Sequence, residues 1–126
     1  MTAMQMQAYK DVQRSAATSG RDIEAAALSN TALRLTECKQ HWDEEGHFKR
    51  LDEALRLNQK LWTIFQGEMV RQDNPLPEAI KRNILELSLF VDRQIIDIMH
   101  TPHPEKLDIL INININLAAG LRNNPK

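Results

Sequence analysis

The sequence predicts an all-α protein, a single-domain bundle of about five helices with no β-sheet. Only four glycines and five prolines occur in 126 residues, and every proline lies after residue 74, which leaves long uninterrupted segments. Apolar residues recur at steps of three or four along most of these segments, as expected for helices with one buried face. The length suits one domain, so we treat residues 1–126 as a single unit.

Two helices are expected in the first third of the chain. The first spans about Met4–Ala17, and Thr18–Gly20 is interpreted as a break, after which Ser19 and Asp22 have the spacing of a capping box. A helix this short is marginal alone, so residues 1–18 are interpreted as a mobile arm at a partner surface, with a frayed end as the alternative. The second helix follows with an apolar stripe and ends near its last member: Leu28, Ala32, Leu35, Cys38 and Trp42.

The third and fourth helices are predicted to form the central hairpin. The third, about Phe48–Arg71, follows the glycine-containing stretch Asp43–His47, and the fourth, about Pro77–His100, follows a proline-rich break. Because the fourth is apolar on most sides, we expect it to be the central helix. The third carries the most regular stripe in the sequence: Phe48, Leu51, Leu55, Asn58, Trp62, Phe65 and Met69.

The stretch "LINININLAAGL", Leu110–Leu121, alternates like a half-buried strand. No other segment alternates in this way, and a strand without a partner is unstable. At helical spacing the same stretch gives an apolar row, so a fifth helix starting near Pro104 is expected, with Gly120 as its C-terminal cap. The row consists of Ile109, Ile113, Leu117 and Leu121.

Polar and aromatic residues within these apolar rows are the candidate partner-binding residues: Asn58, Trp62, Phe65, Asn112 and Asn116. On a helix, Asn112 and Asn116 share a face, whereas Asn114 points elsewhere and is expected to face inward. The alternative is that the amides join helices inside the core and satisfy buried groups there. Trp62 and Phe65 are expected in the core more than at an interface, although tryptophan is common in binding hot spots.

Several classes of function have no residues to support them. The sequence contains no glycine-rich phosphate loop, no paired-cysteine metal pattern and no nucleophile elbow, so neither an enzyme nor a cofactor is expected. The four histidines lack the spacing that presents two imidazoles on one helix face, so no metal site is expected. The lone Cys38, on an apolar stripe, predicts a buried, inert thiol and a reducing compartment.

Membranes and nucleic acids are also poor candidates as partners. No apolar run approaches the length of a membrane span, and the N-terminal residues do not resemble a secretory signal. The net charge of −1 argues against nucleic-acid binding, which usually needs a basic surface.

Three segments carry a resemblance to a known family. "LNQKLWTIF" (residues 57–65), "NPLPEAIKRNILELSLFVDR" (residues 74–93) and the ending Ile113-Asn114…Gly120-Leu121 are similar to the FlaF family of flagellar biosynthesis regulators. The opening "QAYKDVQ" followed by "SGRDIEAAAL" also resembles that family. The similarity covers nearly the whole chain in the right order, although no single motif is specific to the family.

The resemblance implies a small cytoplasmic all-α protein of alphaproteobacteria that is needed for flagellin production and export. Members of the family are described as acting after transcription, together with an antagonistic regulator called FlbT, and as binding flagellin like a secretion chaperone. Flagellin's terminal segments are amphipathic and helix-forming, so a helix-in-groove complex is the natural mode of binding. Which end of flagellin is bound and the oligomeric state stay open.

Two alternatives remain beside a flagellin chaperone. One is a direct regulator of flagellin mRNA, and the other is a helical adaptor that acts only through FlbT. The basic residues available to hold RNA are Lys49, Arg50, Arg56, Lys60, Lys81 and Arg82. The few aromatic rings for base stacking count against the RNA alternative.

Overall fold

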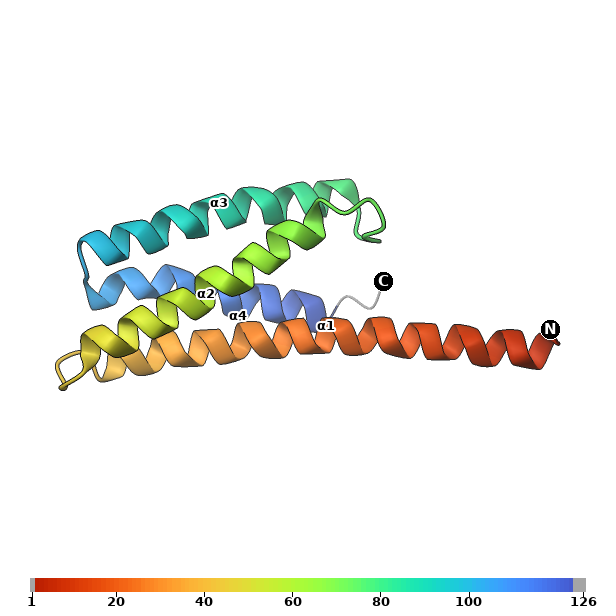
Figure 1. Ribbon diagram of the computed structural model, residues 1–126, viewed down its shortest axis with the longest axis horizontal. Coiled ribbons are helices and arrows are strands. Elements are labelled where there is room, and N and C mark those ends of the chain that lie inside the picture. Colours follow the sequence, from red (N-terminus) through yellow and green to blue (C-terminus); the bar gives the residue numbers. More distant parts are fainter. Residues whose placement is uncertain (1, 124–126) are drawn as a thin grey trace.

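The computed structural model describes the backbone of residues 2–123 and the side chains of residues 2–5 and 21–122. This part of the chain contains no strand, which confirms the all-α prediction. Its helices are α1 (Ala3–Gln40), α2 (His47–Met69), α3 (Glu78–His100), the short 3₁₀ helix η1 (Pro104–Lys106) and α4 (Leu107–Asn123) (Figure 1).

Helix α1 is one continuous helix, so the predicted break at Thr18–Gly20 is wrong. The helix starts at a capping box that the sequence reading missed: Gln5 N donates to Thr2 Oγ1 at 3.2 Å, and Thr2 N donates to Gln5 Oε1 at 2.9 Å. A glycine inside a helix costs only about 1 kcal/mol relative to alanine, whereas a break leaves backbone groups unpaired on both sides. Continuing the helix is therefore favoured.

The N-terminal part of α1 extends beyond the rest of the bundle (Figure 1). The predicted mobility of residues 1–18 lies outside what the structure describes, because only the backbone is described for most of them. It stays a prediction.

Helix α3 is not the central helix that the sequence predicts, because it packs mainly against α2. Helix α1 packs along α4 and against α2, and α2 packs against α3 in the predicted hairpin. One face of α3 is buried, but Leu89, Phe90, Ile96 and Met99 on its other sides remain exposed. In the view of Figure 1, α3 lies at one edge of the bundle, so neither α1 nor α4 covers its outer side. All members of the predicted α2 stripe except Phe48 are buried.

The turn between α1 and α2 is held by Arg50. Its guanidinium donates hydrogen bonds to the backbone carbonyls of Glu45, His41 and Glu44 at 2.8, 3.0 and 3.3 Å. Gly46, before α2, has a φ of +81°, in the left-handed region where glycine is favoured. The exposed C-terminal end of α1 and the start of α2 are therefore fixed together by one side chain.

The alternating stretch is helical, as predicted, but Gly120 is not a cap. Helix α4 continues through it to Asn123, and of the described glycines only Gly46 has a positive φ. Two polar contacts attach α4 to α1. Lys39 Nζ lies 2.6 Å from Asp108 Oδ1 near its start, and Arg122 donates to Ser29 Oγ at 3.1 Å near its end.

Candidate partner-binding site

A chain of hydrogen bonds inside the core joins α2 to α4. Trp62 Nε1 donates to Asn114 Oδ1 at 3.0 Å, and Asn114 Nδ2 donates to Asn58 Oδ1 at 2.6 Å. All three side chains are completely buried. The amide nitrogen of Asn58 has no hydrogen-bond partner, so the chain of bonds ends there with one unsatisfied donor. The inward position predicted for Asn114 is confirmed.

The five predicted partner-binding residues separate into two groups. Asn58 and Trp62 are fully buried and Phe65 is 2% exposed, packed edge-on against the Trp62 ring at 5.6 Å between centroids. Asn112 and Asn116 are exposed on α4. The expectation that Trp62 and Phe65 belong to the core is confirmed, and a partner could touch the buried three only after a helix moved. The partner-binding role of the five stays a prediction.

An apolar groove lies between α3 and α4, toward the start of α3 and the end of α4. We call it the α3–α4 groove. Its cavity, of about 150 Å³, is predominantly apolar, with Arg21 as its one charged lining residue. The apolar residues that line it are Leu76, Ile80, Ile84, Leu117, Gly120 and Leu121. The groove exists because α4 packs along α1 and makes few contacts with α3, and in the view of Figure 1 α3 and α4 diverge toward this end.

A second cavity, of about 220 Å³, continues the groove toward the end of α2 and the connection between α2 and α3. Arg21, Leu76 and Leu121 line both cavities. The second cavity also exposes the carboxyl groups of Glu24, on α1, and Glu68, on α2. The combined surface therefore has an apolar floor with acidic groups at one end.

We call Glu24 and Glu68 the carboxyl pair. The pKa of Glu24 is raised to about 7, first by burial and then by a hydrogen bond and charge repulsion from Glu68. Arg21 lowers the pKa of Glu24, but by less. A carboxyl group buried beside another carboxylate ionises less easily, so Glu24 is protonated in part of the molecules near neutral pH.

Residues 5–121 match the family model described as flagellar protein FlaF. The chain belongs to the FlaF family. No curated protein and no solved structure matches it. The family match covers α1 almost from its start to the end of the α3–α4 groove at Leu121, so every structural feature of the candidate site lies within the FlaF region.

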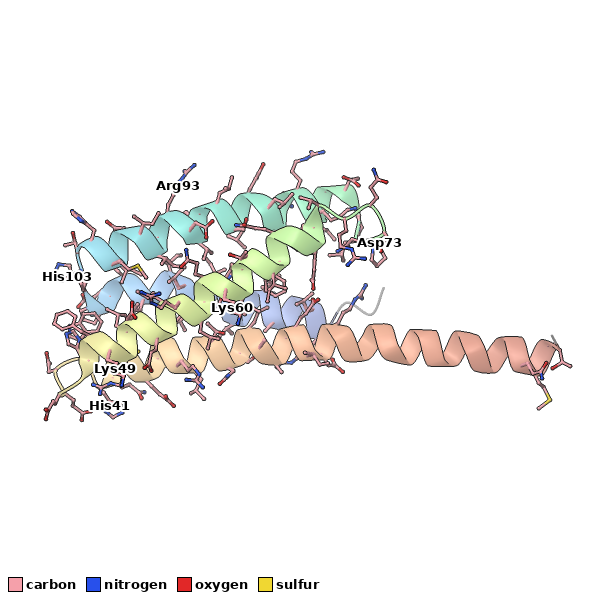
Figure 2. The ribbon with its side chains drawn as sticks, viewed as in Figure 1. His41, Lys49, Lys60, Asp73, Arg93 and His103 are labelled. Atoms are coloured by element: carbon pink, nitrogen blue, oxygen red, sulfur yellow. The ribbon has the colours of Figure 1, made fainter. Side chains whose placement is uncertain are left out.

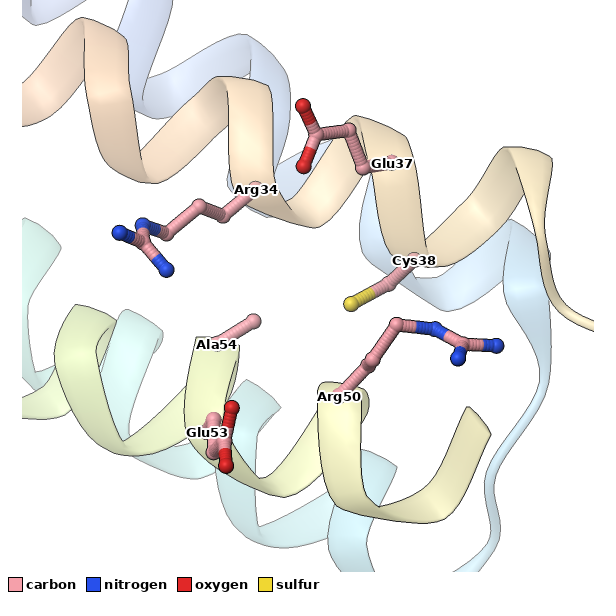
Figure 3. Close-up of a pocket in the computed structure, with 6 residues that line it drawn as sticks. All are labelled: Arg34, Glu37, Cys38, Arg50, Glu53 and Ala54. Atoms are coloured by element: carbon pink, nitrogen blue, oxygen red, sulfur yellow. The ribbon is translucent and has the colours of Figure 1, made fainter. Parts of the chain in front are cut away.

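Another cavity in this FlaF protein, of about 170 Å³, surrounds Cys38 between α1 and α2 (Figure 3). The sulfur points into the space, and Arg34 and Arg50 lie on either side of it (Figure 3). Cys38 is 5% exposed, which confirms its predicted burial. Burial raises the pKa of the thiol more than Arg50 lowers it, so the reactive thiolate form is disfavoured.

Three of the six basic residues that could hold RNA contact groups within this FlaF protein. Arg50 holds the α1–α2 turn, Arg56 Nε lies 2.9 Å from Asp52 Oδ2, and Lys81 Nζ lies 3.1 Å from Glu78 Oε1. Lys49 and Lys60 lie on α2, and Arg93, which is not one of the candidates, lies on α3 (Figure 2).

Neither a metal-binding group nor a membrane-spanning helix is found in the described part of the FlaF chain. No group of three His, Cys, Asp or Glu side chains is placed to hold a metal ion among these residues. No described helix is both long and apolar enough to cross a membrane.

Sequence reasoning missed the α3–α4 groove. Leu117 and Leu121 belong to the predicted apolar row of the last helix, and such a row does not show whether a partner helix closes over it. The available signal was Gly120, which was interpreted as a cap because glycine often ends helices. A glycine inside a helix can also mark a place where another backbone or a ligand comes close.

Proposed function

We propose that this FlaF protein binds flagellin as a secretion chaperone in the cytoplasm, and that this binding supports flagellin synthesis after transcription and flagellin export. The role is non-catalytic. Family membership supports a flagellar role, and the observation that carries the proposal further is the α3–α4 groove. An open apolar groove flanked by two helices is the surface on which the apolar face of an amphipathic helix binds.

The groove has exposed apolar surface that a partner could cover reversibly. Leu76, Ile80, Leu117 and Leu121 in its lining are only partly buried, so they still have apolar surface to lose from water. Burying such surface provides roughly 25 cal/mol for each Å² removed from water. The helices are held together by a buried core that does not depend on the groove. A partner can therefore bind in the groove without the helices unfolding.

The arrangement of the basic residues favours a protein partner over flagellin mRNA. Affinity for RNA depends on several cations that contact phosphates together, and it falls steeply with salt. At least three of the six candidate cations are engaged within the protein, by Glu78, Asp52 and the α1–α2 turn. Binding to an apolar groove should instead depend only weakly on salt.

The test is a calorimetric titration of the purified protein with purified flagellin monomer and, separately, with flagellin leader RNA, each over a series of salt concentrations. We expect a saturable complex with flagellin whose affinity changes little with salt, and no saturable complex with the RNA. Tight, salt-sensitive RNA binding without flagellin binding would contradict the proposal. Binding only to FlbT would assign the protein to the adaptor class.

A further inference from the structure

We propose that the α3–α4 groove receives an amphipathic helix that crosses α4 directly over Gly120 and places a lysine or arginine against the carboxyl pair. This inference names the binding surface and the chemistry of the partner, and it rests on the proposed function only for the identity of the natural ligand. Three observations support it: open space above a helical glycine, an apolar lining beside that glycine, and acidic groups at the end of the same surface.

The space above Gly120 is the first observation. Apart from the adjoining residues and the backbone of its own helix, a Cβ atom added there would meet no atom within 4 Å, and the position has no positive φ that would require glycine. Glycine inside a helix is less stable than alanine, so its presence brings no benefit to the isolated fold. It does allow another backbone to approach α4 closely, which a larger side chain would prevent.

The apolar lining is the second observation. Leu117 and Leu121 lie on α4 on either side of Gly120 in the sequence, and Ile80 and Ile84 face them from α3 across the cavity. These residues are spaced by three or four along their helices and therefore present side chains along one direction. A partner helix lying in the groove would place its own apolar stripe among them.

The acidic groups near the groove indicate that the partner helix carries a basic side chain. The second cavity shares Arg21, Leu76 and Leu121 with the groove, so a helix long enough to pass Gly120 reaches Glu24 and Glu68. Even with Arg21 lowering it, the pKa of Glu24 is about 7, so Glu24 carries a proton in part of the molecules near neutral pH. A basic side chain can replace that proton and form charge-assisted hydrogen bonds with both carboxylates.

The other charged groups at this end of the bundle have partners of their own. On α3, Lys81 lies 3.1 Å from Glu78, and on α4, Arg122 donates to Ser29. In the α2–α3 connection, Arg71 Nη2 lies 2.8 Å from Asp73 Oδ2. Arg21, on α1, is the cation that acts on Glu24. Among the described residues that line the second cavity, a ligand cation would therefore meet Arg21 and the carboxyl pair as the charged groups.

The experiment uses two variants that differ only in position. Gly120→Phe fills the groove, and Gly67→Phe is the matched control, because Gly67 is also a helical glycine whose added Cβ would meet nothing within 4 Å but it lines neither cavity. Flagellin titrations should show at least about a tenfold weaker affinity for Gly120→Phe and an unchanged affinity for Gly67→Phe. Thermal melts establish that both variants fold, and Gly120→Ala serves as a smaller change that should be at least as stable as the wild type.

A designed helical peptide of roughly 18 residues, with a leucine stripe and one flanking lysine, tests the charge chemistry without flagellin. Replacing that lysine with glutamine should weaken binding about 5-fold or more. Because binding displaces a proton, affinity for the lysine peptide should rise from about pH 6 to about pH 8, and Glu24→Gln should remove this dependence. Calorimetry in buffers with different ionisation enthalpies should detect the released proton.

The outcomes separate the two proposals. If flagellin binds Gly120→Phe as tightly as the wild type, the groove assignment is wrong and the proposed function stands. If flagellin does not bind at all but the peptide shows the predicted dependence on lysine and on Gly120, the proposed function is wrong and the assignment stands. If the peptide binds equally with lysine and glutamine, the carboxyl pair is not part of the site.

Discussion

Trp62 on α2 and Asn114 on α4, 52 positions apart in the sequence, are joined inside the core by a hydrogen bond of 3.0 Å from the indole nitrogen to the amide oxygen. The same Asn114 donates to Asn58 at 2.6 Å. A buried polar chain of this kind can be satisfied in only one arrangement of the two helices, because any shift along the helix axis breaks both bonds. It therefore sets how α4 lies on α2.

Asn114→Ala should lower the free energy of unfolding by about 2–4 kcal/mol, because it leaves the Trp62 N–H and the Asn58 oxygen buried without partners. Asn112→Ala and Asn116→Ala are the matched controls on the same helix. Both side chains are exposed, so these variants should be neutral or more stable by a few tenths of a kcal/mol (about 0.2–0.5). Urea denaturation measures all three, and equal effects at 112, 114 and 116 would rule out the buried chain.

Trp62→Phe separates the packing of the indole from its hydrogen bond. The phenyl ring keeps most of the apolar contact but cannot donate to Asn114, so a loss of about 1–3 kcal/mol is expected. Trp62→Ala should cost about 3–5 kcal/mol, since Trp62 is fully buried. Thermal melts give the order of the three proteins. If Trp62→Ala kept its stability and lost only flagellin affinity, the residue would be an anchor for the partner instead.

Arg50→Ala should destabilise the protein by about 1–3 kcal/mol, because three backbone carbonyls at the α1–α2 turn lose their donors. Arg50→Lys should recover only part of this, since a lysine cannot reproduce the planar fork of the guanidinium. Gly46→Ala should also cost about 1–2 kcal/mol at its φ of +81°. Chemical denaturation of the three variants tests the turn, and a neutral Arg50→Ala would contradict it.

The carboxyl pair predicts an unusual dependence of stability on pH. The folded-state pKa of Glu24, about 7, lies above its ordinary value of 4.5, so the folded protein holds a proton that the unfolded chain releases. The contribution of Glu24 is therefore most favourable below the ordinary value and is lost as the pH rises toward 7. Relative to the wild type, Glu24→Gln should gain stability as the pH increases through this range. Melting temperatures of both proteins, compared at each pH, isolate the effect, and a constant difference would contradict it.

The positions of helices α2, α3 and α4 and the inward orientation of Asn114 could be predicted from the sequence. Helical spacing identified α2, α3 and α4, and the geometry of an α-helix alone placed Asn114 on a different side from Asn112 and Asn116. The choice of helix over strand for residues 110–121 was also correct, because it depended on the absence of any strand partner.

The errors have a common physical cause, which is that local signals do not specify what lies on the other side of a helix. Thr18–Gly20 has the composition of a break, but an unbroken backbone ladder is worth more than the penalty of one glycine. Helix α3 has apolar residues on most sides, yet Ile96 is 66% exposed because no described helix covers that side. The groove at Gly120 arises from the relative positions of α3 and α4. The apolar pattern of one helix does not contain this information.

Hydrogen exchange of the protein with and without flagellin monomer tests the central claim most directly, because it locates the binding surface. Binding in the α3–α4 groove should slow exchange of the backbone amides in the first half of α3, around Ile80 and Ile84, and in the last turns of α4, around Leu117 and Leu121. The amides near Ile96 at the other end of α3 should be unchanged. Protection confined to the end of α3 or to the α1–α2 turn, with none around Ile80 and Leu117, would show that flagellin does not bind in the groove.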